Sequence, residues 1–317
     1  MSEVKFHEFL YHDGDGVSLV PRTGRVRYSV RRLLLMLFCA ASLVAPSASL
    51  GADLKEETLK AWDTYIQAAD TEMRSRLDTS FLGIEESPDA LQRVRNGEIL
   101  VSPVGAQIPR HVPSGLIHDW IGVAFIPNAR LEDVLSAARD YDNYKKFYQP
   151  TVVDSKSLGR EGPADLYWMR VVNRQVVADT ALDIEYETTY FQIDDRRCYN
   201  STHTRRVREV RHYGKPDEAE LPPDQGSGYI WRLYSIARFE ERDGGVYVEL
   251  EAIALSRDIP VGLRWLVNPI VRRVSKNSML ISLQQMEKAV GSTVAEKRKA
   301  LSYRAATNSY GGATTQR

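Results

Sequence analysis

The side chains with the most capacity for chemistry are charged residues that alternate along two neighbouring segments predicted as strands. Asp183, Glu185 and Glu187 share one face of the first segment. The arginines that share one parity in the next segment are Arg197, Arg205 and Arg211. Opposite charges across a hairpin stabilise a solvent-exposed face, which is the interpretation we favour. The alternative is that the carboxylates line a cavity and act as general acid and base.

Aromatic and aliphatic residues hold the opposite parity of the first segment and recur in the strands predicted around it. If these faces are concave, they line either a filled core or a ligand cavity with a few polar groups. The candidate lining residues are Trp168, Tyr186, Tyr190, Tyr229, Trp231 and Leu233, together with Ile270 and Val274 from a C-terminal helix. The candidate polar anchors for a ligand are Arg170, His203, Arg232 and Arg238.

Several classes of chemistry have no signature in the chain. There is no phosphate-binding G-x-x-x-x-G-K-[ST] motif and no G-x-G-x-x-G after a strand, so we expect no nucleotide cofactor. The histidines show no H-E-x-x-H spacing, and the two cysteines, Cys39 and Cys198, cannot form a thiolate zinc site. We therefore predict no metal and no cofactor, and we interpret Cys198 as a small buried apolar residue.

Composition is that of a globular protein, with 43% hydrophobic and 26% charged residues. The 42 basic residues balance 42 acidic ones, so the net charge gives no reason to expect nucleic acid as a partner. Nothing in the sequence points to an obligate oligomer. The basic stretch Arg272–Lys276 is predicted to be a solvated helix face, and a peripheral contact with membrane lipids is the alternative.

The first 52 residues are predicted to be a secretory signal. Basic residues from Arg25 to Arg32 precede an apolar run over 33–45, and a tail of small residues follows to Ala52. About thirty residues precede the apolar run, which makes the basic region long for a signal. We expect export to the periplasm or beyond, with cleavage near 49–52; the alternative is an uncleaved N-terminal anchor.

Downstream of the signal, the periodicity predicts an α+β fold. A helix is expected at 53–78 within an N-terminal helical extension covering 53–114. A strand at 117–126, a helical segment and about six further strands follow, with a hairpin turn at Asp243-Gly244. A long helix is expected from Asn268-Pro269 to about Val290, and a disordered tail over 291–317. The predicted architecture is a curved antiparallel sheet of about six or seven strands wrapped around the long helix.

Two stretches resemble a known superfamily. Residues 140–155 (DYDNYKKFYQPTVVDS) resemble the helix-to-strand passage of START-like proteins, also called SRPBCC or polyketide cyclase/dehydrase proteins. Residues 248–269 resemble the last strand of that superfamily running into its C-terminal helix. The resemblance covers about 115–290 and implies a helix-grip fold that encloses an apolar molecule. It carries no catalytic residues, because the superfamily shares no catalytic motif.

These features support three functions. The first is an exported protein that holds or transfers a hydrophobic small molecule, such as a lipid or a quinone, in an internal cavity. The second is a cyclase/dehydrase-like or hydrolase-like enzyme that uses the same cavity. The third is a non-enzymatic envelope scaffold with a filled core, which binds another protein through 53–114.

Overall fold

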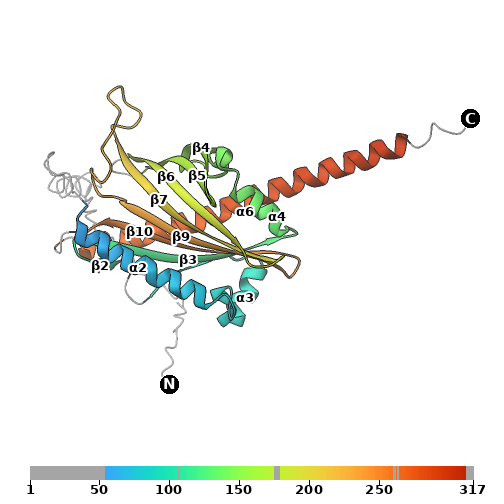
Figure 1. Ribbon diagram of the computed structural model, residues 1–317, viewed down its shortest axis with the longest axis horizontal. Helices are drawn as coiled ribbons and strands as arrows, with labels where there is room; N and C mark the ends of the chain where they lie inside the picture. Colours follow the sequence, from blue (N-terminus) through green and yellow to red (C-terminus); the bar gives the residue numbers. More distant parts are fainter. Residues whose placement is uncertain (1–53, 106–107, 175–178, 260–261, 263, 312–317) are drawn as a thin grey trace, which may run out of the picture. The chain divides into compact units, whose positions relative to one another are not determined.

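The computed structural model describes residues 54–311, except for 106–107, 175–178, 260–261 and 263. The predicted signal over 1–52 therefore lies outside the described residues. The fold is α+β, as predicted, with one antiparallel sheet and a long C-terminal helix (Figure 1). Within the described part of the chain, no helix is long and apolar enough to cross a membrane.

Seven long strands form the body of the sheet, in the order β3-β10-β9-β7-β6-β5-β4. Three short strands complete its ten: β1 and β2 each pair with β3, and β8 pairs with β7. The bounds of the long strands are β3 Gly115–Pro127, β4 Val152–Glu161, β5 Ala164–Arg174, β6 Asp179–Gln192, β7 Arg197–Arg211, β9 Arg232–Arg242 and β10 Gly245–Arg257. The short strands are β1 Leu100–Pro103, β2 Arg110–Val112 and β8 Ala219–Glu220.

The predicted hairpin at Asp243-Gly244 is confirmed. Arg242 of β9 pairs with Gly245 of β10, so Asp243 and Gly244 are the two loop residues. Both have positive φ, 57° and 82°, which is the conformation of a two-residue turn whose twist matches that of the flanking strands. This turn fixes the register of the β9–β10 pair and therefore decides which side chains of both strands face each side of the sheet.

Helix α6 (Arg264–Gly311) packs on one face of the sheet, which we call the cavity face. The packing is close at β3, because a Cβ atom on Gly122 would lie 2.7 Å from Leu283 Cδ1 and 2.9 Å from Met279 Cγ. A core cluster that includes Trp120, Phe239 and Leu283 joins the helix to the sheet. The helix-grip arrangement expected from the sequence is therefore present.

The predicted ends of this helix were wrong at both termini. It begins at Arg264, so Pro269 lies inside it instead of at its first position. It also continues past Gly291 to Gly311, which replaces most of the tail predicted as disordered over 291–317. A single glycine in a helix costs only about 1 kcal/mol, and the good helix formers that follow it, among them Ala295, Glu296 and Lys297, continue the helix.

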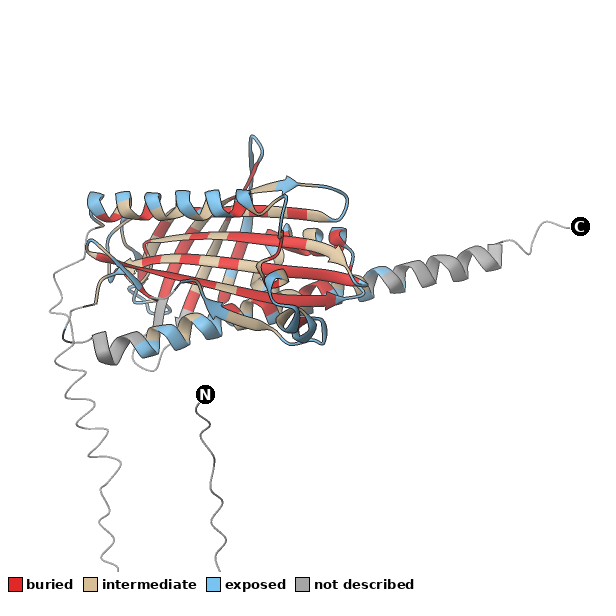
Figure 2. Ribbon diagram, turned by 90° about the horizontal axis from the view of Figure 1, so that it is seen from below, coloured by how far each residue is buried: buried red, intermediate tan, exposed pale blue. Residues whose placement is uncertain are grey.

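Helix α2 (Glu56–Ser75) covers part of the opposite face, which we call the outer face. Trp62 and Met73 of α2 are buried against Ile117 and Ile253 of the sheet. Figure 2 shows the other side of α2 exposed along its length. Because both of their faces are covered, β3 and β10 are buried at nearly every position instead of at alternate ones.

The remaining elements are short. The segment predicted as a helical extension over 53–114 contains helices, but it also supplies β1 and β2 to the sheet. Segment 131–147 leads from β3 towards β4. The short helical elements are η1 Gly83–Glu86, α3 Pro88–Arg95, α4 Leu131–Ala138, η2 Tyr141–Asn143 and α5 Tyr144–Phe147.

Candidate ligand cavity

Two adjoining cavities lie between α6 and the cavity face of the sheet. The first has a volume of about 330 Å³ and is closed at one end by η2 and α5. The second has a volume of about 490 Å³ and lies nearer to the start of α6. The two adjoin because they share the lining residues Thr151, Val171, Leu250, Ser278 and Ser282. The space under α6 is therefore not a filled core, which removes the premise of the scaffold hypothesis.

Tyrosines form one wall of this space. The rings of Tyr141 and Tyr167 stack with centroids 4.2 Å apart, and those of Tyr167 and Tyr186 with centroids 5.0 Å apart. Tyr144 contacts the edge of this stack. Stacked and edge-on rings stabilise each other by about 0.5–1.5 kcal/mol beyond the burial of their area. The stack therefore holds a flat aromatic surface against the cavity before any ligand arrives.

The hydroxyl groups of these tyrosines are protonated at neutral pH. Burial raises the pKa of Tyr190 to about 12 and that of Tyr167 well above its usual value, because a phenolate loses its hydration there. Tyr190 donates a hydrogen bond of 3.0 Å to the carbonyl oxygen of Ala138, and Tyr141 donates one of 3.1 Å to Asp165. The hydroxyl protons of Tyr190 and Tyr141 are therefore donated to oxygens of the protein, and these tyrosines add no charge to the space.

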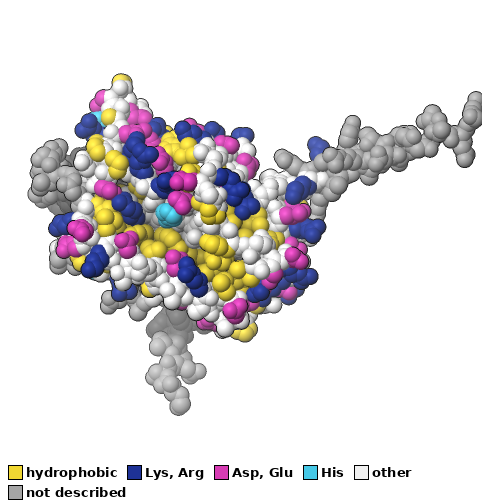
Figure 3. All heavy atoms as spheres, viewed as in Figure 1, with side chains coloured by type: hydrophobic (Ala, Val, Ile, Leu, Met, Phe, Trp, Pro, Cys, Tyr) yellow, Lys and Arg dark blue, Asp and Glu magenta, His cyan; other side chains and the backbone are white. Residues whose placement is uncertain are grey.

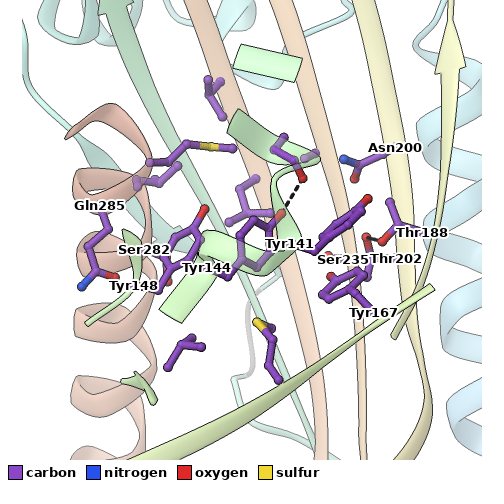
Figure 4. A pocket seen from close by; sticks show the side chains of 18 of the residues that line it. Tyr141, Tyr144, Tyr148, Tyr167, Thr188, Asn200, Thr202, Ser235, Ser282 and Gln285 are labelled. Atoms are coloured by element: carbon purple, nitrogen blue, oxygen red, sulfur yellow. Dashed lines mark hydrogen bonds between the residues drawn. The ribbon is translucent and has the colours of Figure 1, made fainter. Parts of the chain in front are cut away.

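Further polar groups face the first cavity from both sides (Figure 4). The sheet contributes Thr188 and Thr202, whose hydroxyl oxygens lie 2.8 Å apart, and the amide of Asn200. The helix contributes Ser282 and Gln285. All of these groups are neutral, and among the described residues that line the first cavity none is charged.

His118 is the one ionisable side chain other than tyrosine that the structure describes in the lining of the second cavity. Its Nε2 lies 2.8 Å from the hydroxyl oxygen of Ser256. Burial lowers its pKa to about 4, because the imidazolium would lose hydration without gaining a carboxylate partner. The ring is therefore neutral at neutral pH and can accept a proton or donate a hydrogen bond.

Five of the eight predicted lining residues face this space. Tyr190 lines the first cavity, and the second is lined by Tyr186, Tyr229, Leu233 and Val274. These residues come from β6, from the loop before β9, from β9 and from α6, and they are brought together only in the folded protein.

The other three predicted lining residues lie elsewhere. Trp168 faces outward, with Lys156 Nζ over its ring at 5.4 Å. Trp231 belongs to the core cluster between α2 and the outer face of the sheet. Ile270 is on the solvent side of α6 and is 54% exposed. The alternation rule assigned Trp168 and Trp231 to the wrong face. Trp231 precedes β9 and does not follow the alternation of that strand. On β5, Tyr167 and Met169 face the cavity, so Trp168 between them faces outward.

None of the four predicted polar anchors lines the cavity. Arg170 forms a two-bond ion pair with Asp183 on the outer face, at 2.6 and 2.7 Å. His203 is exposed and lies 3.6 Å from Glu187. Arg232 pairs with Asp224, and Arg238 is buried on the outer face beside Glu249. The three arginines are matched by carboxylates of the protein, and the described residues that line the first cavity include no cationic anchor.

The alternating carboxylates lie on the outer face and not in the cavity, as the preferred interpretation has it, but among the described ion pairs only that of Glu187 and Arg205, 3.8 Å apart, joins the partners it named. Asp183 and Glu185 lie on the outer face and pair with Arg170 and Arg206. Figure 3 shows basic and acidic side chains interspersed on that side of the molecule. A register shift at Glu185–Tyr186 gives Glu185 the partner Arg206, which has the opposite parity to the predicted arginines.

Four important lining residues were not predicted: Tyr141, Tyr144, Tyr148 and Tyr167. Three of them lie in the aromatic-rich stretch 140–155, where their density was visible in the sequence. Their direction was not visible, because η2 and α5 are too short for a helical stripe to develop. Tyr167 sits between Trp168 and Leu166, and only the observed register shows that it faces inward.

No family model matches the sequence, and no curated protein sequence matches it. Solved structures align with parts of the chain at low sequence identity. A STAR-related lipid transfer protein from Xanthomonas axonopodis is 18% identical, with a TM-score of 0.39 and coverage of 60% of this chain and 98% of that one. Human STARD10 is 11% identical, with a TM-score of 0.40 and coverage of 72% and 89%.

The di-domain aromatase/cyclase StfQ of the steffimycin biosynthetic pathway is 11% identical, with a TM-score of 0.38 and coverage of 73% of this chain and 61% of that one. START-type lipid-transfer proteins and aromatase/cyclases are the kinds of protein that the two sequence stretches resemble. The helix-grip arrangement of the chain itself is shown by the packing of α6 on one face of the antiparallel sheet.

Proposed function

We propose that this protein binds an uncharged, largely apolar small molecule in the space between α6 and the sheet. The observation that carries the proposal is the character of the lining. Most of the lining side chains are aromatic or aliphatic, and a few carry hydroxyl or amide groups. The described residues around the first cavity include no charged group. Apolar walls with a few placed polar groups are typical of small-molecule sites.

The absence of charge among these lining residues narrows the ligand class. A buried carboxylate or ammonium group without a partner costs several kcal/mol or more. A fatty acid would therefore have to leave its carboxylate outside the cavity, whereas a quinone-like or other neutral oxygen-bearing molecule could enter whole. Ring oxygens could accept hydrogen bonds from Ser282 on the helix side and from the amide of Asn200 on the sheet side.

We also propose that the protein acts after export and near a membrane. Export is supported by the basic, apolar and small-residue regions within residues 1–52. Proximity to a membrane is supported by α6, which carries nine Lys and Arg against two Glu in a chain of zero net charge. Ile270 and Ile281 are exposed on this helix, and exposed apolar residues among basic ones favour an interfacial contact.

The first test is native mass spectrometry of gently purified protein. Calorimetry follows, with neutral 2-naphthol and with 2-naphthoate, which carries a carboxylate on the same ring system. We expect a neutral apolar adduct to co-purify, and 2-naphthol to bind at least tenfold more tightly than 2-naphthoate. Ser282→Trp fills both cavities and is expected to abolish this binding. Gln284→Trp, an exposed position of the same helix, should retain it and serves as the matched control.

Two results would contradict the proposal. Equal binding of the anion would mean that the cavity has a cationic anchor after all. Binding that survives Ser282→Trp would place the ligand elsewhere.

An enzyme that uses the same space is the second candidate, and His118 is the observation that favours it. Its neutral imidazole faces the second cavity and could serve as a general base. The native mass spectrum separates the two functions. A bound compound whose mass changes with time in the wild type, but not in His118→Gln, would establish catalysis, and an unchanged mass in both favours binding alone.

A further inference from the structure

A separate cavity of about 490 Å³ lies on the other side of the sheet, beneath α2. Small residues on the helix, Ala61, Ala68 and Ala69, leave this space open. Val112 and Pro113 add apolar surface at one side. The cavity is thus large enough for a small organic molecule, and most of its walls are apolar.

Its floor is acidic. Asp119 of β3 lines the cavity and is 1% exposed. Its Oδ2 accepts a hydrogen bond of 2.8 Å from the hydroxyl of Tyr65, whereas its Oδ1 has no hydrogen-bond partner among the described residues. Glu251 of β10 lies beside it on the floor, and Glu72 faces the cavity from α2. Burial, assisted by the charge of Glu251, raises the pKa of Asp119 to about 7.

The basic groups nearby, which include Arg110 and His111 in the cavity lining, neutralise this floor only in part. Arg110 lies over the ring of Tyr65, 5.4 Å from its centroid, and His111 lies 3.5 Å from Asp258. Arg238 is committed to Glu249 at 2.8 Å and reaches Glu251 only at 3.7 Å. A buried carboxylate oxygen without a donor costs about 1–3 kcal/mol, and more when charged. A donor entering the cavity would recover that cost.

We propose that this cavity binds a small organic ammonium ion with an apolar body. The ammonium group would lie against Asp119 and Glu251 and would supply the hydrogen-bond donor that Asp119 Oδ1 lacks. The apolar body would pack against the alanines of α2 and against Val112 and Pro113. This site is independent of the space under α6, because the ten-stranded sheet separates the two.

The proposal is tested by titrating the full chain with hexylammonium and, separately, with uncharged hexanol, following backbone amide shifts by NMR. We expect hexylammonium to bind at one site beneath α2 and hexanol to bind at least tenfold more weakly. Asp119→Asn keeps the size of the side chain and should weaken hexylammonium at least tenfold. Ala68→Phe should block the cavity, whereas Gln67→Phe, one residue away and outside the lining, should not.

Ser282→Trp distinguishes this proposal from the function proposed above. It should leave hexylammonium binding unchanged while it abolishes binding of 2-naphthol. Loss of hexylammonium binding in Ser282→Trp would place the amine under α6 and overturn the proposal. Equal binding of hexanol, or unchanged binding in Asp119→Asn, would overturn it as well.

Discussion

The two faces of β9 and β10 carry different kinds of side chain. On β9, Ala237 and Phe239 face α6, while Arg238 between them faces outward. On β10, Val248 and Leu250 face the cavity, while Glu249 between them faces outward. The cavity face presents neutral groups to empty space, whereas the outer face at this point buries Arg238 and Glu249 as an ion pair of 2.8 Å. Charged side chains are therefore buried at this pair because each has a fixed partner, whereas the described residues that line the first cavity under α6 are all neutral.

The largest effect is expected from removing one partner of the buried ion pair on the outer face. Arg238→Met leaves Glu249, which also accepts hydrogen bonds from the backbone N–H groups of Gly83 and Ile84, without its cation. Removing one partner of a buried ion pair typically costs about 3–5 kcal/mol. We expect that loss in the free energy of unfolding, measured by denaturant titration.

The double variant Arg238→Met/Glu249→Gln is the control. It should recover part of the loss, because a neutral amide can still accept from Gly83. A single variant as stable as the wild type would show that the buried pair contributes little.

The second prediction uses the neutral histidine of the cavity face. The pKa of His118 is lowered by burial from 6.5 to about 4, so the unfolded chain binds a proton below pH 6.5 that the folded chain does not. Stability is therefore retained above pH 6.5 and lost as the pH falls from 6.5 towards 4. The expected loss is about 3 kcal/mol at 1.36 kcal/mol per pKa unit.

Calorimetry between pH 7.5 and 4 measures this loss, and His118→Gln should remove it from the profile. An identical slope in the variant would assign the acid sensitivity to other groups.

The smallest effect is expected at the solvated part of the outer face. Arg206→Gln removes the 2.7 Å ion pair with Glu185, in which the two side chains are 40% and 29% exposed. Exposed ion pairs contribute less than about 1 kcal/mol, so the melting temperature should shift by only a few degrees at most. A loss of stability as large as that expected for Arg238→Met would show that burial does not decide how much an ion pair contributes.

Much of the fold could be predicted from the sequence, because its signals are local. Each of these signals lies within a short stretch of sequence: the side-chain pattern of β3, the Asp243-Gly244 turn and the apolar stripe of α2. The end of α6 could not be predicted in this way. Gly291 looked like a stop signal, and its cost is small beside the helix-forming residues that follow.

The site was predicted less completely, because facing depends on distant partners. Tyr186, Tyr190 and Leu233 were assigned to the right face. Arg170 and Arg238 were misplaced, because the carboxylates that hold them come from other strands.

The sequence by itself determined the elements, the antiparallel order and the presence of a C-terminal helix, since periodicity and turn chemistry act over short range. The tertiary structure alone decided which ion pairs form on the outer face, that the space under α6 is lined by neutral tyrosines, and that a second, acidic cavity lies under α2. These choices follow from strand register and from helix packing. A shift of one residue exchanges the two faces of a strand, and no local signal records which face will meet a helix.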